Sequence, residues 1–236
     1  MYNDKITIIV SVYNELASLP ELLQKISHQL GLLPAEVNCI ISDDGSTDET
    51  VPFLQNAQVT YPWLSFIHAP VNCGKSNALK SAIDITESNY IIILDGDLQN
   101  DPKDFLPLYQ TIKNTQTDCV AGWRKFRKDD PLKNILSRIY NTLINIIFDM
   151  DLHDHNCGMK IFRKDALSKV ALNGEWHRYI TVLLFHAGFK VTEMEVIHHP
   201  RPHGKSRYGI NRYIRFFMDL PPLMKQIKLQ RTGVKL

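Results

Sequence analysis

Short apolar runs alternate with segments of helical spacing through the first half of the chain. The runs are rich in β-branched residues and cover residues 5–12, 37–42, 64–68 and 90–94. Apolar residues with helical spacing follow over residues 16–30, 49–59 and 76–86. Strands that are apolar on both faces and alternate with helices are typical of a mostly parallel sheet with helices on both faces. The pattern therefore predicts a Rossmann-like α/β fold.

The second half of the chain carries a weaker pattern. A strand pattern begins near residues 117–121, a long helix is predicted over residues 131–148, and no repeat or linker-like stretch divides the chain. The long helix has an apolar stripe, which we interpret as core packing rather than a lipid groove, although its N-terminal part could serve both. The stripe consists of Leu132, Ile135, Leu136, Ile139, Leu143 and Ile147. We expect one domain over residues 1–210 and a basic amphipathic tail over residues 211–236.

The charge of the chain is unevenly distributed. Residues 201–236 carry nine Lys or Arg and a single acid, Asp219, so that this region is +8 and the first 200 residues are −6. Basic residues interleaved with apolar ones favour an anionic membrane surface. No apolar run approaches the ~20 residues that span a bilayer. We expect the tail to lie on a membrane, with Pro221 and Pro222 interrupting any continuous helix.

The composition indicates a soluble globular protein. The chain of 236 residues is 44% hydrophobic and 22% charged, which excludes collagen, coiled coil and bulk disorder. Its four cysteines form no C-x-x-C pair, and the N-terminus leads directly into a strand pattern without a signal-peptide pattern. We therefore expect a protein of the reducing cytoplasm.

Polar clusters follow three of the predicted strands. Residues 13–15 (Tyr-Asn-Glu) follow the first strand, Asp43 and Asp44 the second, and residues 95–97 (Asp-Gly-Asp) the fourth. The carboxyl ends of parallel strands meet at one edge of the sheet, where ligands bind. A single acidic turn is common, but three at one edge predict a ligand site.

The pair Asp95 and Asp97 has the chemistry of a cation site. Hard divalent cations prefer oxygen ligands, and Mg²⁺ is typically held by one or two carboxylates together with substrate phosphates. Gln99 could supply a further oxygen. An isolated pair of this kind is also commonly a capped turn, so both interpretations stay open at this point.

Other enzyme classes fit the motifs poorly. Residues 74–76 (Gly-Lys-Ser) resemble part of a P-loop, but Ala69 stands where the first glycine belongs and Pro70 removes a backbone N–H, which leaves an NTPase as a distant alternative. A dinucleotide-binding turn needs glycines that residues 11–15 lack. The histidines near residues 153–155 and 198–203 lack the partners and spacing of a zinc site.

Taken together, the motifs resemble those of family 2 glycosyltransferases, over about residues 5–220. In the first half they are Val12-Tyr13-Asn14-Glu15, Asp43-Asp44-Gly45-Ser46-Thr47-Asp48, Asn72-Cys73-Gly74-Lys75 and Asp95-Gly96-Asp97-Leu98-Gln99. In the second half they are Gly122-Trp123-Arg124-Lys125, Ser137-Arg138, Asn156-Cys157-Gly158-Met159-Lys160, Gly174-Glu175-Trp176-His177-Arg178 and the loop over residues 198–208. The second set resembles the polyprenyl-phosphate branch, which includes dolichol-phosphate mannose synthases. The resemblance implies the GT-A fold.

The resemblance implies roles for the strand-end residues in binding a nucleotide-sugar donor. The nucleotide and its diphosphate would contact Val12, Tyr13, Asn14, Glu15, Asp43, Asp44, Lys75, Asp95, Gly96, Arg201 and Lys205. Mg²⁺ or Mn²⁺ would be held by Asp95, Asp97 and Gln99. Ser11 stands where relatives usually carry proline, which loosens the following turn slightly. UDP and GDP, and the identity of the sugar, stay open.

The resemblance also implies a polyprenyl phosphate acceptor. Its phosphate would contact Arg124, Arg138, Thr142, Ser206 and Arg207, since guanidinium groups suit phosphate. The catalytic set would be Asp97, Arg124, Arg138 and Glu175, with inversion at the sugar. A phosphate acceptor is already ionised and needs no strong base, whereas the alternative, a saccharide or glycolipid hydroxyl, would need Glu175 as one. We expect attachment at the cytoplasmic face of a membrane, either direct or through an anchoring protein, and no nucleic-acid partner.

Overall fold

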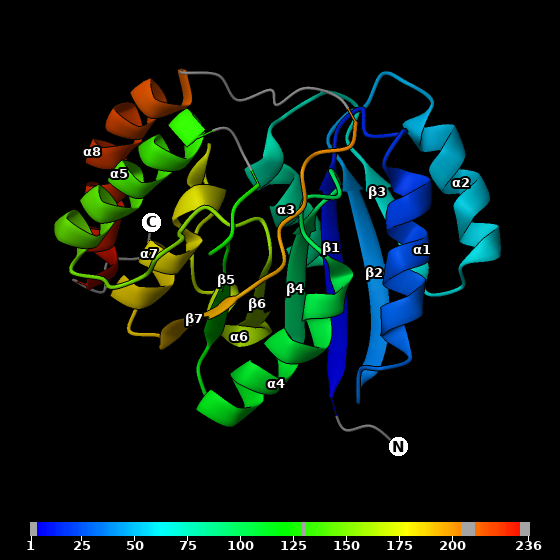
Figure 1. Cartoon of the computed structure of the whole chain (residues 1–236), viewed down its shortest axis with the longest axis horizontal. Helices are drawn as coiled ribbons and strands as arrows, with labels where there is room; N and C mark the ends of the chain where they lie inside the picture. The colour runs from blue at the N-terminus through cyan, green and yellow to red at the C-terminus, as the bar shows by residue number, and fades with distance from the viewer. Residues whose placement is uncertain (1–3, 129–130, 204–210, 232–236) are drawn as a thin grey trace.

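The computed structural model describes residues 4–128, 131–203 and 211–231, the side chains of residues 211–217, 230 and 231 excepted (Figure 1). The strands are β1 (Lys5–Val12), β2 (Glu36–Asp43), β3 (Leu64–His68), β4 (Tyr90–Asp95), β5 (Cys119–Trp123), β6 (Lys160–Arg163) and β7 (Val191–Glu195). The helices are α1 (Leu19–Leu30), α2 (Thr50–Thr60), α3 (Lys75–Asp84), α4 (Phe105–Thr115), α5 (Pro131–Phe148), α6 (Lys164–Leu167), α7 (Ile180–His186) and α8 (Asn211–Arg231). Two short 3₁₀ helices, η1 (Pro102–Asp104) and η2 (Trp176–Tyr179), complete the elements.

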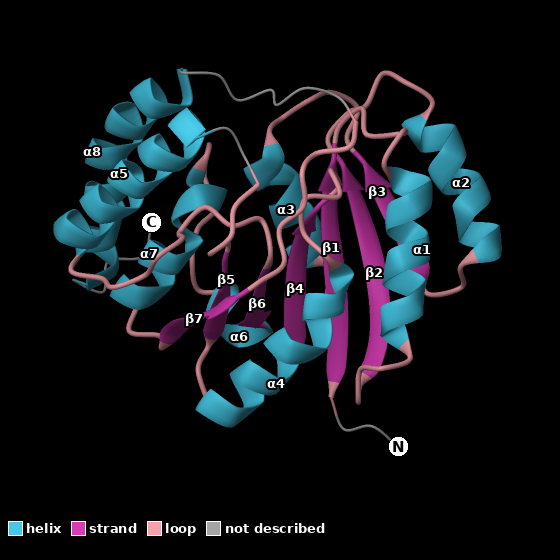
Figure 2. Ribbon diagram, viewed as in Figure 1, coloured by secondary structure: helices cyan, strands magenta, loops and turns pink. Residues whose placement is uncertain are grey.

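The strands form one seven-stranded sheet in the order β3-β2-β1-β4-β6-β5-β7 (Figure 2). Neighbouring strands are parallel except that β6 runs antiparallel to both β4 and β5. The predicted mostly parallel sheet is therefore confirmed. The predicted strands agree with the structure to within one residue for residues 5–12, 37–42, 64–68 and 90–94.

The register of the sheet aligns the strand ends. Val12 lies opposite Asp43 across the β1–β2 pair, and Ser11 lies opposite Asp95 across the β1–β4 pair. The polar residues that follow β1, β2 and β4 consequently reach the same edge of the sheet. This is the edge at which the sequence predicts a ligand site.

Two layers of helices cover the sheet because successive residues of each strand point to opposite faces. Ile8 belongs to a buried cluster that includes residues of α1, α2 and α4, whereas Ile9 belongs to one that includes residues of α3, α5, α6, α7 and α8. Both side chains are fully buried. Full burial of such a side chain contributes about 1.5–3 kcal/mol, so the two layers hold the sheet edge in place.

The predicted core role of the apolar stripe on α5 is wrong for most of its residues, although Leu143 packs against the buried core as predicted. Leu132, Ile135 and Ile139 are 63%, 54% and 52% exposed, and Ile147 is exposed as well. The buried face of α5 is formed instead by Ser137, Tyr140, Asn141, Ile144 and Phe148. A helix with apolar residues on two faces buries only the face that packs against the rest of the protein. In α5 this is the face that also carries the polar residues Ser137 and Asn141.

The helix α8 also differs from expectation, because it continues through Pro221 and Pro222. A proline inside a helix loses one backbone hydrogen bond and costs about 3 kcal/mol. Leu223 and Ile227, which follow the prolines, are buried in the cluster that contains α7, and their burial offsets this cost. Across the described part of the chain, every helix is too short or too polar to cross a membrane.

Candidate functional site

The loops after β1 and β2 are joined by Asn14. Its backbone N–H donates to Ser46 Oγ (2.7 Å), its side-chain oxygen accepts from the backbone N–H of Thr47 (2.8 Å), and its own φ of 53° is left-handed. Asparagine tolerates this conformation better than most residues. Tyr13 and Glu15 flank it, so the predicted first and second polar clusters lie together.

Asp43 and Asp44 are both buried and shape the loops at the end of β2. Asp43 accepts hydrogen bonds from Ser46 and lies 2.6 Å from His68 Nδ1. Asp44 accepts from the backbone N–H groups of Cys73 (2.8 Å) and Gly74 (3.0 Å). The carboxylates thus fix the loops that lead into α2 and α3. Their direct contact with a nucleotide stays a prediction.

Asp95 and Asp97 lie at the end of β4, and each carries a basic partner. Lys75, the first residue of α3, forms an ion pair with Asp95, and Arg201 forms one with Asp97 and lies 3.4 Å from Glu15. Burial alone would raise the pKa of Asp95, but the Lys75 ammonium outweighs it and lowers that pKa. Burial, together with the neighbouring Asp95, raises the pKa of Asp97 to about 6.

The packing around Asp95 and Asp97 leaves no room for a side chain at Gly96 or Gly158. A Cβ on Gly158 would lie 2.3 Å from Asp95 Oδ2, and a Cβ on Gly96 would lie 2.7 Å from Val12 Cγ1. Gly96 also donates its backbone N–H to the Ser11 carbonyl (3.3 Å). The two glycines therefore fix the position of the carboxylates against β1 and against the loop before β6.

The side chains at the end of β4 supply only part of the oxygen ligands that a divalent cation needs. Two carboxylates that attract Lys75 and Arg201 offer hard oxygen ligands, and Gln99 lies next to them with its backbone N–H on Asp97 Oδ1 (3.1 Å). Within the described ranges, no cluster of three or more His, Cys, Asp or Glu side chains could hold a metal ion. A cation here would thus need oxygens from a ligand to complete its coordination.

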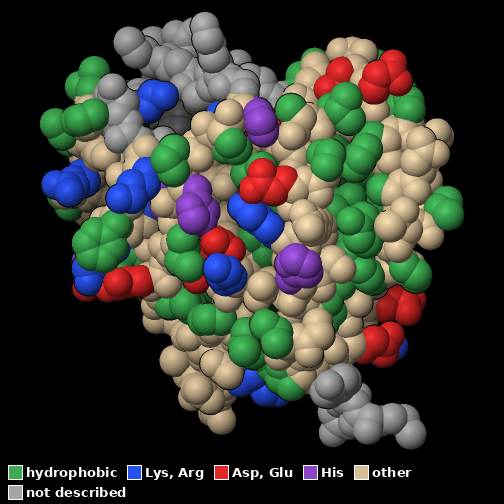
Figure 3. Space-filling model, turned by 45° about the vertical axis from the view of Figure 1, so that its right-hand side comes forward, with side chains coloured by type: hydrophobic (Ala, Val, Ile, Leu, Met, Phe, Trp, Pro, Cys, Tyr) green, Lys and Arg blue, Asp and Glu red, His purple; other side chains and the backbone are tan. Residues whose placement is uncertain are grey.

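A segment after β7 joins the two sides of the site. The backbone N–H of Val196 donates to the Trp123 carbonyl (3.0 Å), and that of Ile197 donates to the Asp104 carboxylate (2.7 Å). Further along, the N–H of His199 donates to the Gln99 carbonyl (2.8 Å), and Arg201 forms its ion pair with Asp97. This segment, orange in Figure 1, crosses in front of the sheet. Figure 3 shows acidic, basic and histidine side chains side by side in the middle of one face.

A pocket of about 600 Å³ lies between α5 and the loops after β5 and before β6. Among the residues that line it are Arg124, Arg138 and Thr142, which the sequence predicts as acceptor ligands. Residues that the prediction missed also line it, namely Lys125, Arg127, Asn134, Ser137, Asn141 and Asn145. The helical spacing of the asparagines on α5 could have indicated this polar face.

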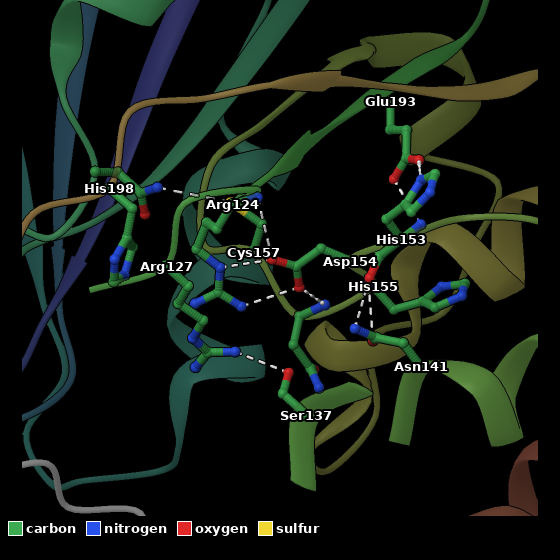
Figure 4. A network of polar contacts seen from close by, with 12 residues as sticks. Arg124, Arg127, Ser137, Asn141, His153, Asp154, His155, Cys157, Glu193 and His198 are labelled. Atoms are coloured by element: carbon green, nitrogen blue, oxygen red, sulfur yellow. Dashed lines mark hydrogen bonds and ion pairs between the residues drawn. The ribbon is translucent and has the colours of Figure 1, made fainter. Parts of the chain in front are cut away.

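A buried ion pair is part of the pocket lining, and Figure 4 shows its contacts. Arg124 donates from Nε to Asp154 Oδ2 (2.6 Å) and from Nη2 to Oδ1 (2.9 Å), and the two side chains are 10% and 6% exposed. Burial would raise the pKa of Asp154, but Arg124 lowers it to about 2. Arg127 lies beside the pair and donates to Ser137 Oγ (2.8 Å).

Glu175 lies close to the start of α3. Its carboxylate pairs with Arg178 (2.9 Å), and its Oε1 lies 3.9 Å from the place where a Cβ on Gly74 would stand, next to Lys75. The loop is held to α3 by Ser76 Oγ, which lies 2.9 Å from His177 Nδ1. The carboxylate of Glu175 thus lies near the first residue of α3, and Glu175 does not line the pocket. The remaining predicted ligands, Lys205, Ser206 and Arg207, lie outside the described residues.

Comparison with known proteins identifies relatives in sequence. The family model "Glycosyl transferase family 2" matches residues 7–171. A dodecaprenyl-phosphate galacturonate synthase from Rhizobium johnstonii is 36% identical over 93% of this chain and 66% of its own length. An undecaprenyl-phosphate 4-deoxy-4-formamido-L-arabinose transferase from Proteus mirabilis is 27% identical over 98% of this chain and 71% of its own length. The chain thus spans about two thirds of the length of these relatives.

Solved structures share the fold at lower sequence identity. A mannosyltransferase from Pyrobaculum calidifontis, determined with GDP-Man and Mn²⁺, has a TM-score of 0.65 at 16% identity over 90% of this chain and 60% of its own. Glucosyl-3-phosphoglycerate synthase from Mycobacterium tuberculosis, determined with Mn²⁺, UDP and phosphoglyceric acid, has a TM-score of 0.65 at 16% identity over 99% and 80%. With the family match over most of the chain, the protein belongs to glycosyl transferase family 2 and has the GT-A fold.

Proposed function

We propose that this glycosyltransferase moves a sugar from a nucleotide-diphosphate sugar to the phosphate of a polyprenyl lipid, with inversion at the anomeric carbon. The observation that carries the proposal is the pocket beside α5. It is lined by arginines on one side of the helix, and an exposed apolar stripe lies on the same helix. The names of the relatives, both sugar transferases to polyprenyl phosphates, agree with this assignment.

The faces of α5 match the two parts of such an acceptor. Arg138 and Thr142 line the pocket, while Leu132, Ile135 and Ile139 stand exposed along the helix. Exposed apolar residues in a row are rare on monomeric soluble proteins and mark interaction sites. A lipid phosphate would place its charged head in the pocket and its chain along the stripe. We extend the proposal to peripheral binding of the protein at the cytoplasmic face of a membrane.

The reaction forms a bond between an acceptor phosphate oxygen and the anomeric carbon, and breaks the bond from that carbon to the donor diphosphate. The nucleoside diphosphate leaves with the electron pair, and Lys75, which pairs with Asp95, would stabilise its charge. Asp95, Asp97 and Gln99 would hold Mg²⁺ or Mn²⁺, which when bound supplies further charge stabilisation to the diphosphate. Arg201 would exchange its partner Asp97 for a donor phosphate.

A hydroxyl acceptor is the second candidate, and the position of Glu175 disfavours it. A hydroxyl must lose a proton during transfer and therefore needs a base within hydrogen-bond reach. Glu175 pairs with Arg178 and does not line the pocket. A phosphate acceptor is ionised near neutral pH and needs no such base.

Radiolabelled transfer tests the proposal. The purified protein is incubated with UDP- and GDP-linked sugars, galacturonate first because of the relative named for it, and with polyprenyl phosphate in detergent. We expect label in the butanol-soluble lipid that mild acid releases, as a sugar joined through phosphate would be. Label that appears only when the acceptor ends in a hydroxyl would reject the phosphate acceptor.

A further inference from the structure

We propose that His177 binds the sugar of the donor, with its Nε2–H donating to an oxygen atom of that sugar, while Ser76 fixes the imidazole ring through Nδ1. This inference rests on the proposed function, because it takes a nucleotide-diphosphate sugar as the donor. The reaction described above gives His177 no part.

The contacts between His177 and Ser76 determine which ring nitrogen carries the hydrogen. Ser76 Oγ accepts from the backbone N–H of His177 at 3.0 Å and lies 2.9 Å from its Nδ1. Ser76 is fully buried, and among the described residues Nδ1 is the one acceptor within reach of its hydroxyl hydrogen. A buried hydroxyl hydrogen without an acceptor is unfavourable, so Ser76 donates to Nδ1.

The other ring nitrogen is consequently a donor. Burial lowers the pKa of His177 well below its ordinary value, and the Lys75 ammonium lowers it further, so the ring is neutral. A neutral imidazole whose Nδ1 accepts a hydrogen bond carries its hydrogen on Nε2. In the part of the chain that the structure describes, no protein group accepts from Nε2, and the residue is only partly buried. This N–H can therefore bind a ligand that offers an oxygen.

The short helix that contains His177, η2, borders the path that the sugar has to take. On one side His177 contacts Ser76, the second residue of α3, whose first residue pairs with Asp95 at the edge assigned to the donor. On the other side Tyr179 shares a buried cluster with Tyr140 of α5, and the residue after Tyr140 lines the pocket assigned to the acceptor. During transfer the sugar lies between the donor diphosphate and the acceptor phosphate, and hence beside η2.

The charges around the ring favour an oxygen acceptor. After burial, the groups that lower the pKa of His177 are three cations, Lys75, Arg178 and Lys160. Arg178 pairs with Glu175, and Lys160 is buried with its ammonium on the Cys157 carbonyl. Cations repel a protonated amine and attract a carboxylate. These surroundings suit a hydroxyl or carboxylate oxygen of a neutral or acidic sugar.

Calorimetric binding of a nucleotide with and without its sugar tests the inference. The probes are UDP and UDP-galacturonate with Mn²⁺, and GDP and GDP-mannose as a second pair. We expect His177→Asn to weaken binding of the sugar nucleotide about three- to tenfold and to leave binding of the bare nucleotide unchanged, since one hydrogen bond to the sugar is lost. His28→Asn, a matched change at an exposed histidine in the last turn of α1, should alter neither.

A glutamine variant separates ligand binding from packing. The amide nitrogen of glutamine reaches the place of Nε2, whereas the amide of asparagine reaches only the level of Nδ1. His177→Gln should therefore keep most of the affinity for the sugar nucleotide, although it loses the acceptor for Ser76. A role in packing alone predicts the opposite order, because asparagine can still accept from Ser76. The melting temperature of each variant checks that it stays folded.

Ser76→Ala gives a second test that leaves His177 in place. It removes the donor to Nδ1, so that the ring can also adopt the other tautomer. We expect a smaller loss of the same kind, in the sugar nucleotide and not in the bare nucleotide. Donors that lack one hydroxyl at a time then identify the oxygen, because the unaltered protein and His177→Asn should bind the correct deoxy donor equally.

These measurements contain no acceptor, so they separate the inference from the proposed function. If no sugar is transferred to polyprenyl phosphate but His177→Asn still loses affinity for the sugar nucleotide alone, the proposed acceptor is wrong and the inference stands. The inference is overturned if His177→Asn weakens both probes of a pair equally or neither of them. It is also overturned if the asparagine variant binds the sugar nucleotide better than the glutamine variant, or if the unaltered protein binds neither pair.

Discussion

The buried pair of Arg124 and Asp154 predicts a stability that depends on pH in a defined way. The pKa of Asp154 is about 2 in the folded protein, against an ordinary value of 3.8. A difference of this size contributes about 2.5 kcal/mol at pH 7. Because the folded pKa is depressed, the contribution is complete above the unfolded pKa and is lost as the pH falls through the folded one. At pH 3 about 1 kcal/mol of it is gone.

Asp154→Asn tests this magnitude. The change leaves Arg124 buried without an anionic partner, and breaking one side of a buried pair costs about 3–5 kcal/mol, so we expect a loss of about 3 kcal/mol at pH 7. For a chain of this size that corresponds to a fall in melting temperature of roughly 6–12 °C. The free energy of unfolding is measured in urea for both proteins at pH 7, 5 and 3.

The difference between the two proteins is the informative quantity, because the other titrating groups are common to both. We expect it to be about 1 kcal/mol smaller at pH 3 than at pH 7. Asp84→Asn is the matched control, since Asp84 pairs with Lys80 on the surface of α3 and such pairs contribute only about 0.3–0.5 kcal/mol. A difference that stays constant from pH 7 to pH 3 would refute the reasoning.

Three further predictions concern the site and the membrane. Asp97→Asn should abolish most transfer while the protein stays folded, and excess EDTA should do the same; full activity in EDTA would exclude a metal-dependent step. Ile139→Ser should weaken flotation with anionic vesicles at low salt, whereas Val59→Ser, at an even more exposed apolar position on α2, should not. Gly158→Ala should reduce kcat about 100-fold, because its Cβ would lie 2.3 Å from Asp95 Oδ2; circular dichroism checks that the fold persists.

Local patterns were enough to predict the strands β1 to β4 and the helices α1 to α3. The run over residues 90–94 matches β4 because a short, uninterrupted run of mostly β-branched apolar residues favours a strand that is buried on both faces. The helix expected from residue 16 begins at Leu19 instead, with Pro20 in its first turn, since the residues after Glu15 form a turn. Proline favours this first-turn position, so the later start has a local cause.

The stripe on α5 shows where periodicity stops being informative. Ile139 and Ile144 are both apolar members of one helix, yet Ile139 is half exposed and Ile144 is fully buried. The spacing indicates that apolar faces exist, but which face is buried depends on the direction from which the sheet and α7 approach. That direction is a property of the packed chain.

The sequence by itself determined the α/β class, the order of the elements from β1 to β4 and the acidic edge where β1, β2 and β4 end. These features depend on residues that are close in the chain and on the alternation of strands with helices. This alternation makes the strands parallel, so that their carboxyl ends lie at the same edge of the sheet. Only the tertiary structure decided which basic side chain pairs with which carboxylate. Arg124 and Asp154 are 30 residues apart, and Arg201 and Asp97 are 104 apart. Such pairs form where distant segments cross, and most of the free energy that brings these segments together comes from burial of the core.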